Sequence, residues 1–225
     1  MAEGAELWKA VDRYLSDRLV ASDSALEEAL AANAAAELPA IDVAPNQGKL
    51  LHLLALATNA RSILEIGTLG GYSTIWLARA LPEGGRLLTL EANPKHAEVA
   101  RKNISRAGLS NVVTLRLGPA LDTLPQLVEE NAGPFDLIFI DADKPNIPNY
   151  LTWSLKLSRK GTVILIDNVV RDGEILDASS SDASVQGVRR LFDMLHEEPR
   201  LQSTALQTVG SKGYDGFAMA VVTGN

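Results

Sequence analysis

The sequence predicts an α/β fold: one doubly wound domain with a mostly parallel sheet and an N-terminal helical extension. Short apolar runs alternate with amphipathic segments after Arg61, a pattern typical of strand–helix–strand units. A length of 225 residues suits one such domain. No internal stretch is rich enough in Pro, Gly or Ser to act as a linker. Residues 1–225 are therefore assigned to a single domain, with 1–40 as the extension and 41–225 as the core.

Helical segments precede the alternating region. An Ala- and Leu-rich stretch from about Glu6 to Glu37 predicts two amphipathic helices, divided near Ser22 and Asp23. A third helix is expected from about Asn46 to Ala60, because its leucines fall on one helical face.

Strands and helices then follow in strict order. The expected strands are Ser62–Ile66, Arg86–Glu91, Val112–Leu117, Leu137–Asp141 and Val163–Asp167. The expected helices between them are Ser73–Ala80, Pro94–Ala107, Ala120–Glu130 and Pro148–Leu157. Beyond these we expect a flexible surface loop over Asp177–Ser184, a helix from Gly187 to about His196, and a final hairpin over Leu201–Val209 and Phe217–Val222.

Composition restricts the classes of function. A net charge of −7 argues against a nucleic-acid partner, which usually requires a basic surface. The absence of cysteine excludes disulfides, thiolate catalysis and cysteine-type zinc sites. No apolar run approaches the ~20 residues of a membrane span, and the N-terminus lacks the pattern of a secretory signal. A cytoplasmic protein without membrane attachment is expected.

A glycine-containing turn joins the first strand of the alternating region to its helix. Gly67 and Gly71 in this turn permit positive φ and a close approach of ligand to backbone. The dinucleotide pattern G-x-G-x-x-G is not met, because Leu69 and Tyr72 occupy two of its glycine positions. Glu91 ends the second strand, where an acidic side chain can accept hydrogen bonds from both ribose hydroxyls. These features together favour a nucleotide-type cofactor over a turn glycine and a solvated glutamate.

Polar side chains also end two later strands. Asp141 closes one apolar run, and the pair Asp167 and Asn168 closes the next. Ligands bind at the carboxyl ends of strands in open parallel sheets, and oxygen-only ligands suit Mg²⁺, or alternatively Ca²⁺ or Mn²⁺. Asp141 alone could simply cap a strand, but the neighbouring pair favours a metal site. Lys144 adds a candidate base, and the three histidines show no metal-ligand spacing and are expected to be structural or solvated.

Four motifs together resemble the cation-dependent O-methyltransferases, the family of the caffeoyl-CoA and catechol O-methyltransferases and their bacterial relatives. The motifs are E65-I-G67-T-L-G-G71-Y-S73, Glu91, I140-D-A-D-K144 and I166-D-N168. The resemblance extends over about Val43 to Val222. It implies a Rossmann-like class I methyltransferase fold, with a seven-stranded sheet whose last strand is antiparallel and with helices on both faces.

The resemblance also implies the roles of individual residues. The cofactor would be S-adenosylmethionine, contacted by Val43, Glu65, Gly67, Gly71, Ser73, Glu91, Ala120 and Asp141. Asp141, Asp167 and Asn168 would bind the divalent metal, and Asp141 and Lys144 would be catalytic. The implied reaction is O-methylation of a small catechol-type phenol with vicinal hydroxyls, by a homodimer.

Other functions stay open at this point. Some bacterial relatives methylate a hydroxylated uridine in tRNA, although the acidic composition counts against this acceptor. A non-catalytic S-adenosylmethionine-binding protein would need no metal ligands, and a nicotinamide dehydrogenase would need the missing glycines.

The chain also departs from the family's pattern. Relatives often carry an aromatic wall residue shortly after the Asp-Asn pair, where this chain has Arg171 and Asp172. Asp143 replaces the tryptophan that precedes the lysine in catechol-type members. A more polar or differently shaped acceptor pocket is expected.

Overall fold

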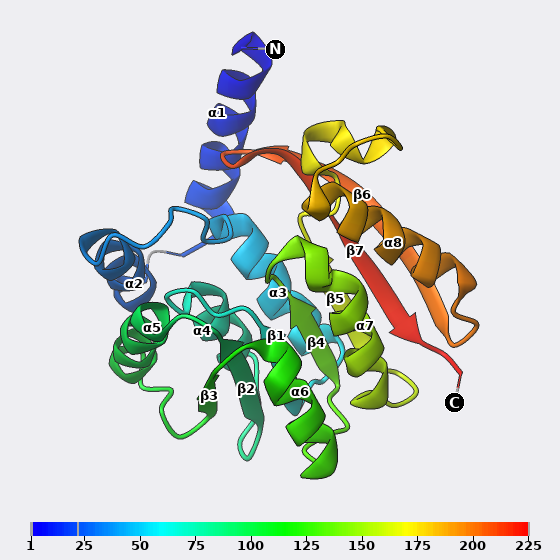
Figure 1. The fold of residues 1–225 in the computed structure, drawn as a ribbon. Helices are drawn as coiled ribbons and strands as arrows, with labels where there is room; N and C mark the ends of the chain where they lie inside the picture. Colours follow the sequence, from blue (N-terminus) through cyan, green and yellow to red (C-terminus); the bar gives the residue numbers. More distant parts are fainter. Residues whose placement is uncertain (1, 22, 225) are drawn as a thin grey trace.

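Seven strands form one sheet in the computed structural model, which describes residues 2–21 and 23–224. Their order across the sheet is β3-β2-β1-β4-β5-β7-β6 (Figure 1). The strands are β1 (Ser62–Ile66), β2 (Arg86–Glu91), β3 (Val113–Leu117), β4 (Leu137–Ile140), β5 (Val163–Asp167), β6 (Leu201–Gly210) and β7 (Gly213–Val222). Strands β1 to β5 pair in parallel, and β7 is antiparallel to both β5 and β6. The predicted mostly parallel sheet with an antiparallel last strand is confirmed.

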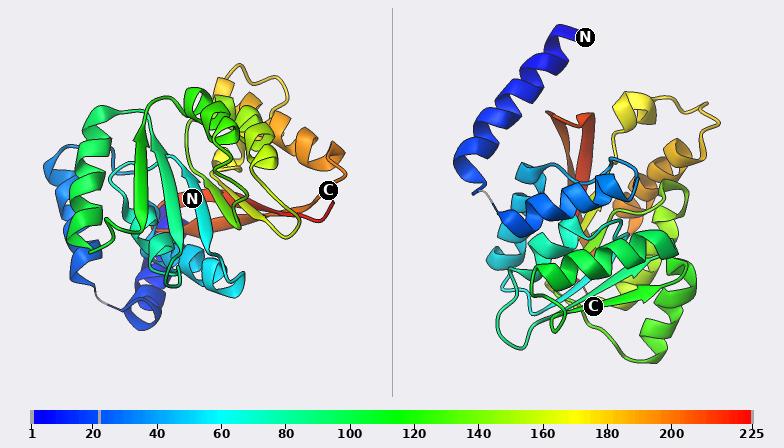
Figure 2. Two further views of the ribbon diagram at one scale, coloured as in Figure 1. Left: turned by 90° about the horizontal axis from the view of Figure 1, so that it is seen from below. Right: turned by 90° about the vertical axis from the view of Figure 1, so that its left-hand side faces the viewer.

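Helices cover both faces of this sheet (Figure 2). They are α1 (Ala2–Leu19), α2 (Ser24–Ala35), α3 (Pro45–Ala57), α4 (Tyr72–Ala78), α5 (Pro94–Arg106), α6 (Ala120–Glu129), α7 (Ile147–Lys156) and α8 (Ala183–Glu197). Two short 3₁₀ helices, η1 (Lys144–Asn146) and η2 (Arg171–Leu176), follow β4 and β5. Residues of α6, α7 and α8 share one apolar core with the sheet, and residues of α2 to α5 share the other.

Strand β4, and β5 up to its final Asp167, are apolar because both of their faces are buried. Side chains of a strand point alternately to opposite faces. In β4, Ile138 and Ile140 accordingly enter one core, whereas Leu137 and Phe139 enter the other. Such continuous apolar runs are typical of parallel strands covered on both sides. The polar residues that follow these apolar runs, Asp141 and Asp167, are therefore easy to recognise in the sequence.

Several predicted boundaries differ from the structure. The helix expected after Gly187 begins at Ala183, because Asp182 caps it by accepting hydrogen bonds from the N–H groups of Ser184 and Val185 at 2.6 and 3.2 Å. The end of the predicted loop Asp177–Ser184 thus belongs to α8. At the N-terminus, Asp23 caps α2, and Ser22 of the predicted division lies outside the described residues.

The N-terminal helix α1 extends away from the rest of the chain (Figures 1 and 2). Asp12 ties it to two other elements: Oδ1 accepts from Asn46 Nδ2 at 2.9 Å, and Oδ2 accepts from the N–H of Ser211 at 2.7 Å. These two hydrogen bonds attach the middle of α1 to α3 and to the turn of the β6–β7 hairpin. Within the described residues, no helix combines the length and apolar character needed to cross a membrane.

Candidate active site

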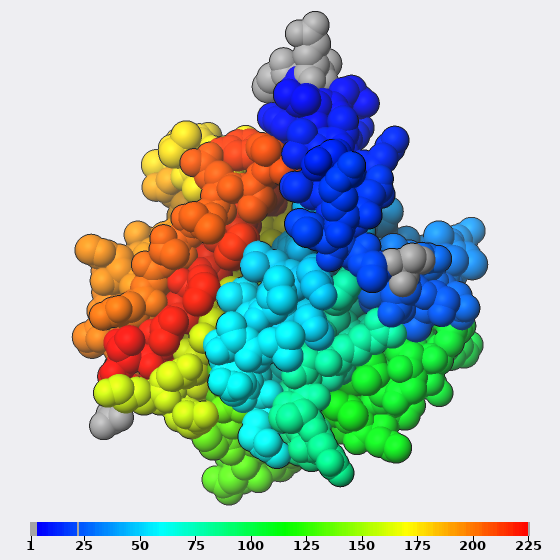
Figure 3. All heavy atoms as spheres, turned by 180° about the vertical axis from the view of Figure 1, so that it is seen from behind, coloured from blue at the N-terminus to red at the C-terminus, as the bar shows by residue number. Residues whose placement is uncertain are grey.

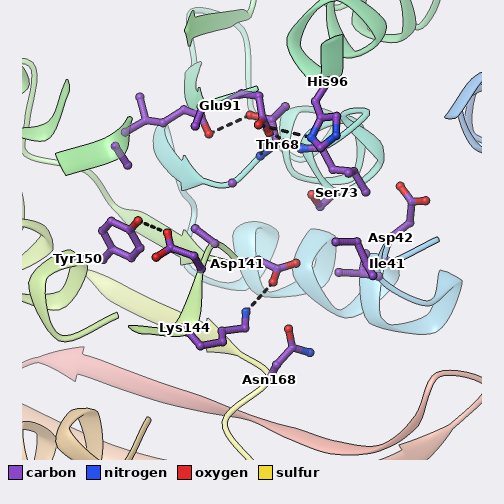
Figure 4. Close-up of a pocket in the computed structure, with 18 of the residues that line it drawn as sticks. Ile41, Asp42, Thr68, Ser73, Glu91, His96, Asp141, Lys144, Tyr150 and Asn168 are labelled. Carbon is purple, nitrogen blue, oxygen red and sulfur yellow. Dashed lines mark hydrogen bonds and ion pairs between the residues drawn. The ribbon is translucent and has the colours of Figure 1, made fainter. Parts of the chain in front are cut away.

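A cavity of about 550 Å³ opens beyond the carboxyl ends of the central strands. Most of the predicted site residues line it, although they come from distant parts of the chain (Figure 4). These residues are Val43, Gly67, Ser73, Glu91, Ala120, Asp141, Lys144 and Asn168. The predicted cofactor loop and two of the three predicted metal ligands therefore face one space.

Gly67 is required where it stands. Its φ is +99°, and a Cβ atom added there would lie 2.1 Å from the carbonyl oxygen of Asp141. A side chain would therefore be both strained and blocked by backbone. Gly71 has a different place from the one expected: it caps α4 with φ +85° and faces Ala100 of α5, and it is not among the residues lining the cavity.

Glu65 also lies outside the cavity lining, fully buried beneath the loop. Its carboxylate accepts hydrogen bonds from the hydroxyls of Ser73, Thr74 and Thr89 at 2.6, 2.5 and 2.7 Å. Burial raises the pKa of Glu65 to about 7, against the lowering effect of these three hydroxyls. The structure thus places Glu65 beneath the glycine loop, where it fixes Ser73 by a hydrogen bond. The direct cofactor contact that the resemblance implied stays a prediction.

Glu91 holds the loop from the cavity side. Its Oε2 accepts from the N–H groups of Thr68 and Leu69 at 3.2 and 2.8 Å, and Oε1 accepts from the N–H of Asn93 at 2.9 Å. Only 9% of Glu91 is exposed. This carboxylate is thus fixed at the end of β2, at the wall of the cavity.

Two titratable residues that sequence reasoning missed also line the cavity. His96 places Nδ1 3.5 Å from Oε1 of Glu91, although it was expected to be structural or solvated. Asp42 accepts from Asn33 Nδ2 at 2.8 Å, and burial raises its pKa. The available signal for His96 was its position in the first turn of α5, directly after the strand that ends in Glu91. For Asp42 it was its position next to Val43.

Two of the predicted metal ligands, Asp141 and Asn168, lie in the cavity together with Lys144. Lys144 Nζ donates to Asp141 Oδ1 at 3.0 Å, and Asn168 lies beside them (Figure 4). Asp167 is buried and faces a second hollow of about 480 Å³, which Asn168 also lines. Burial, followed by the negative charge of Asp141, raises the pKa of Asp167. The negative charge of Asp141 thus disfavours the ionised form of Asp167.

This group fits a hard divalent cation. Among the described residues no three carboxylate, imidazole or thiolate groups gather at one point, so the site would depend on two carboxylates and the amide oxygen of Asn168. Those three oxygens are ligands that Mg²⁺ and Ca²⁺ accept. A cation between the two carboxylates would also relieve their mutual repulsion.

Asp143 lies between the metal end and α7. It is exposed, accepts hydrogen bonds from the hydroxyl of Tyr150 and from Asn146 Nδ2, and lines the cavity. Burial, followed by the hydrogen bond to Asp143, raises the pKa of the Tyr150 hydroxyl. The wall beside Lys144 is therefore polar, as the departure from the family's pattern predicted.

The model of a protein family described as O-methyltransferase matches residues 17–219. The chain belongs to this family. Catechol O-methyltransferases of Niastella koreensis and Mycobacterium tuberculosis are each 57% identical to it, over 96% and 94% of this chain and 98% and 94% of theirs. The crystal structure of an O-methyltransferase from Bacillus cereus in complex with SAH is 62% identical, with a TM-score of 0.96 over 97% of this chain and all of that one.

These findings confirm the resemblance drawn from the four motifs. This O-methyltransferase has the fold of class I methyltransferases, and it is of the catechol and caffeoyl-CoA type. Its cavity contains the glycine loop and the acidic strand ends from which the family was inferred.

Proposed function

We propose that this O-methyltransferase transfers a methyl group from S-adenosylmethionine to one of two adjacent hydroxyls of a small catechol-type phenol, with the help of a divalent cation. One observation carries the proposal: Gly67 and Glu91 face the same space as Asp141, Lys144 and Asn168. A methyl donor at the loop and a hydroxyl at the metal end would meet there. The names of the relatives support both the donor and the acceptor class.

The cofactor would lie along the loop end. Glu91 would hold the ribose, Val43 and Ser73 the methionine end, and Ala120 the adenine, since all four line the cavity. Glu65 and Gly71 would act indirectly. Glu65 fixes Ser73 by a hydrogen bond, and Gly71 lets α4 begin close to α5. Held in this way, the donor would be presented to one side of the metal end.

The metal end would orient and activate the acceptor. Asp141, Asp167 and Asn168 would hold the cation, most suitably Mg²⁺, which supplies Lewis-acid stabilisation of the ionised hydroxyl. Lys144, in its neutral form, accepts the hydroxyl proton and later releases it to solvent. The O–CH₃ bond forms as the S–CH₃ bond breaks, and sulfur keeps the bonding electron pair. The products are a methyl ether and S-adenosylhomocysteine.

The decisive experiment is methyl transfer from S-adenosylmethionine to a panel of catechols, with Mg²⁺ and with excess chelator. Product that forms with Mg²⁺ and is lost with chelator would support the acceptor class and the metal together. Product that persists in chelator would contradict the metal site alone. If no catechol is methylated while calorimetry shows cofactor binding, the acceptor class is wrong.

We also propose that two copies of the chain associate through α1. Five large apolar side chains on this helix are between 38% and 67% exposed, and they fall on one side of it: Leu7, Val11, Tyr14, Leu15 and Leu19. Exposed Leu206 and Val209 lie on β6, which contacts α1 (Figure 3). Exposed apolar side chains gathered on one side of a helix in this way mark association sites. A second copy presenting the same helix would cover it.

A further inference from the structure

Arg171 stands at the acceptor end of the cavity. It is the first residue of η2, three positions after Asn168, and it lines the same space as Asp141 and Lys144. Three residues of chain span at most ~10 Å. We propose that Arg171 binds a carboxylate on the acceptor, so that the enzyme prefers catechols that carry an acid group. This inference rests on the proposed function and specifies its substrate class.

The Arg171 side chain has hydrogen-bond donors to spare. Among the residues that the structure describes, its Nε is one of the buried polar atoms without a hydrogen-bond partner. The nearest carboxylate contact is from Nη1 to Asp215 Oδ2 at 4.0 Å, beyond hydrogen-bond distance. Buried donors are nearly always paired in folded proteins. Nε itself is buried, so a ligand in the cavity would meet the Nη groups of this side chain, which is 34% exposed.

The two carboxylates around Arg171 are already used by the backbone. Asp215 Oδ1 accepts from the N–H groups of Val170, Arg171 and Gly216 at 2.9, 3.0 and 2.9 Å. Asp182 caps α8, and the hydrogen bonds from the N–H groups of Val185 and Ser184, followed by the charge of Arg171, lower its pKa. The carboxylates of Asp215 and Asp182 therefore offset part of the positive charge of Arg171. They leave the N–H groups of its guanidinium free to bind a ligand.

The loop that carries Arg171 is held in one conformation. Asn168, Arg171 and Asp172 all have φ between 54° and 56°, a region that residues other than glycine rarely adopt. The hydrogen bonds to Asp215, and that from the N–H of Val169 to the carbonyl oxygen of Gly216 at 3.0 Å, fix this backbone. Arg171 is therefore presented at a set distance from Asn168, as a specificity residue should be.

A carboxylate is the group that fits these donors best. The planar guanidinium matches a carboxylate with two parallel hydrogen bonds, which an ammonium group cannot make. With the hydroxyls of the acceptor at Asp141 and Asn168, an acid group on the opposite side of the ring would point toward Arg171. A cationic substituent in the same place would be repelled, and an aromatic wall in place of Arg171 would favour an apolar one.

The test compares two acceptors that differ only in this group: protocatechuate, a benzoate with adjacent ring hydroxyls, and its carboxamide. The full-length protein with Mg²⁺ and S-adenosylmethionine should show at least about tenfold higher kcat/KM for the acid, as expected for a charge-assisted hydrogen-bond pair. Calorimetry with S-adenosylhomocysteine and Mg²⁺ should show the same order of affinities. Arg171→Met should reduce the ratio to near one, and Arg171→Lys should restore part of it.

Arg190→Met is the matched control, because Arg190 is exposed on α8 and does not line the cavity. It should keep the wild-type ratio. The two acceptors differ in the acidity of their hydroxyls, but this difference affects every variant equally. Its effect therefore cancels when the acid-to-carboxamide ratio of kcat/KM is compared between variants. A wild-type ratio near one, or a preference that survives in Arg171→Met, would overturn the role of Arg171 while leaving the proposed function intact. If neither acceptor nor catechol itself is methylated, the proposed function fails, and this inference fails with it.

Discussion

Gly67 packs directly against the backbone of Asp141. A Cβ atom on Gly67 would lie 2.1 Å from the carbonyl oxygen of Asp141. The glycine loop after β1 is therefore in van der Waals contact with the predicted metal ligand after β4. These strands are neighbours in the sheet. The spacing between the glycine loop and Asp141 is therefore set by strand pairing and by the absence of a side chain at Gly67.

The first prediction concerns this contact. Gly67→Ala should destabilise the protein by more than the ~1–3 kcal/mol of a strained backbone position, because the methyl group also meets backbone, and it should weaken cofactor binding. Gly213→Ala is the control: Gly213 has a similar φ of +101° but nothing within 4 Å of the added atom. Urea unfolding and calorimetry would measure both effects. Equal losses in the two variants would show that the contact with Asp141 has no importance beyond backbone strain.

A second prediction concerns the pH dependence of stability. The pKa of Glu65 is raised from 4.5 to about 7, so the native state binds more protons than the unfolded state between these pH values. The free energy of unfolding should therefore fall as pH rises from about 4.5 to about 7 and level off above that. Glu65→Gln removes this contribution, so the variant should gain up to about 3 kcal/mol relative to the wild type across this range.

Urea unfolding of both proteins at several pH values would test this. Groups that titrate in both proteins, such as Asp167, cancel in the difference. Glu65→Gln also loses part of the hydrogen bonding to Ser73 and Thr74, which changes the stability at every pH but not its slope. Parallel curves for the two proteins would mean that Glu65 keeps an ordinary pKa in the fold.

A third prediction concerns Glu91. Glu91→Gln should weaken binding of S-adenosylhomocysteine by the ~1.5–3 kcal/mol typical of hydrogen bonds to a charged group, because the carboxylate both fixes the loop and would accept from the ribose. Glu98→Gln on α5 is the control, since Glu98 pairs with Lys102 on the surface. Calorimetric titration of the wild type and the two variants with S-adenosylhomocysteine would measure the three affinities. Wild-type affinity in Glu91→Gln would place the ribose elsewhere.

The sequence shows the strand ends more clearly than the residues around them. Asp141 and Asp167 were predictable because each follows a run of buried apolar residues. The place of Glu65 was not: its hydroxyl partners lie 8 to 24 positions away, and only the folded sheet brings them under the loop. His96 and Asp42 reach the cavity through the packing of α5 and of the segment before α3. The start of α8 was predicted too late, although the sequence contains its signal: Asp182 precedes the periodic run Val185, Val188 and Leu191.

A fourth prediction concerns Lys144. Lys144→Met should lower the rate of methyl transfer by ~10²–10⁴ near neutral pH, the usual contribution of a general base. The loss should shrink as pH rises toward the ~10 at which a phenolic hydroxyl ionises unaided. Lys160→Met, at an exposed position, should keep the wild-type profile. Single-turnover rates from pH 6 to 10 would test this, and a loss independent of pH would retire Lys144 as the base.

The last prediction concerns α1. If its exposed apolar side contacts a second copy, the wild-type protein should have the mass of a dimer by light scattering at micromolar concentration. Leu7→Glu combined with Val11→Glu should shift it toward the monomer, because two charges would be buried without partners. Arg13→Glu changes the net charge by the same amount on the opposite, exposed side of the helix, and should stay dimeric. Circular dichroism would show whether each variant keeps its fold. A monomeric wild-type protein, or a dimer that withstands the double substitution, would rule out α1 as the interface.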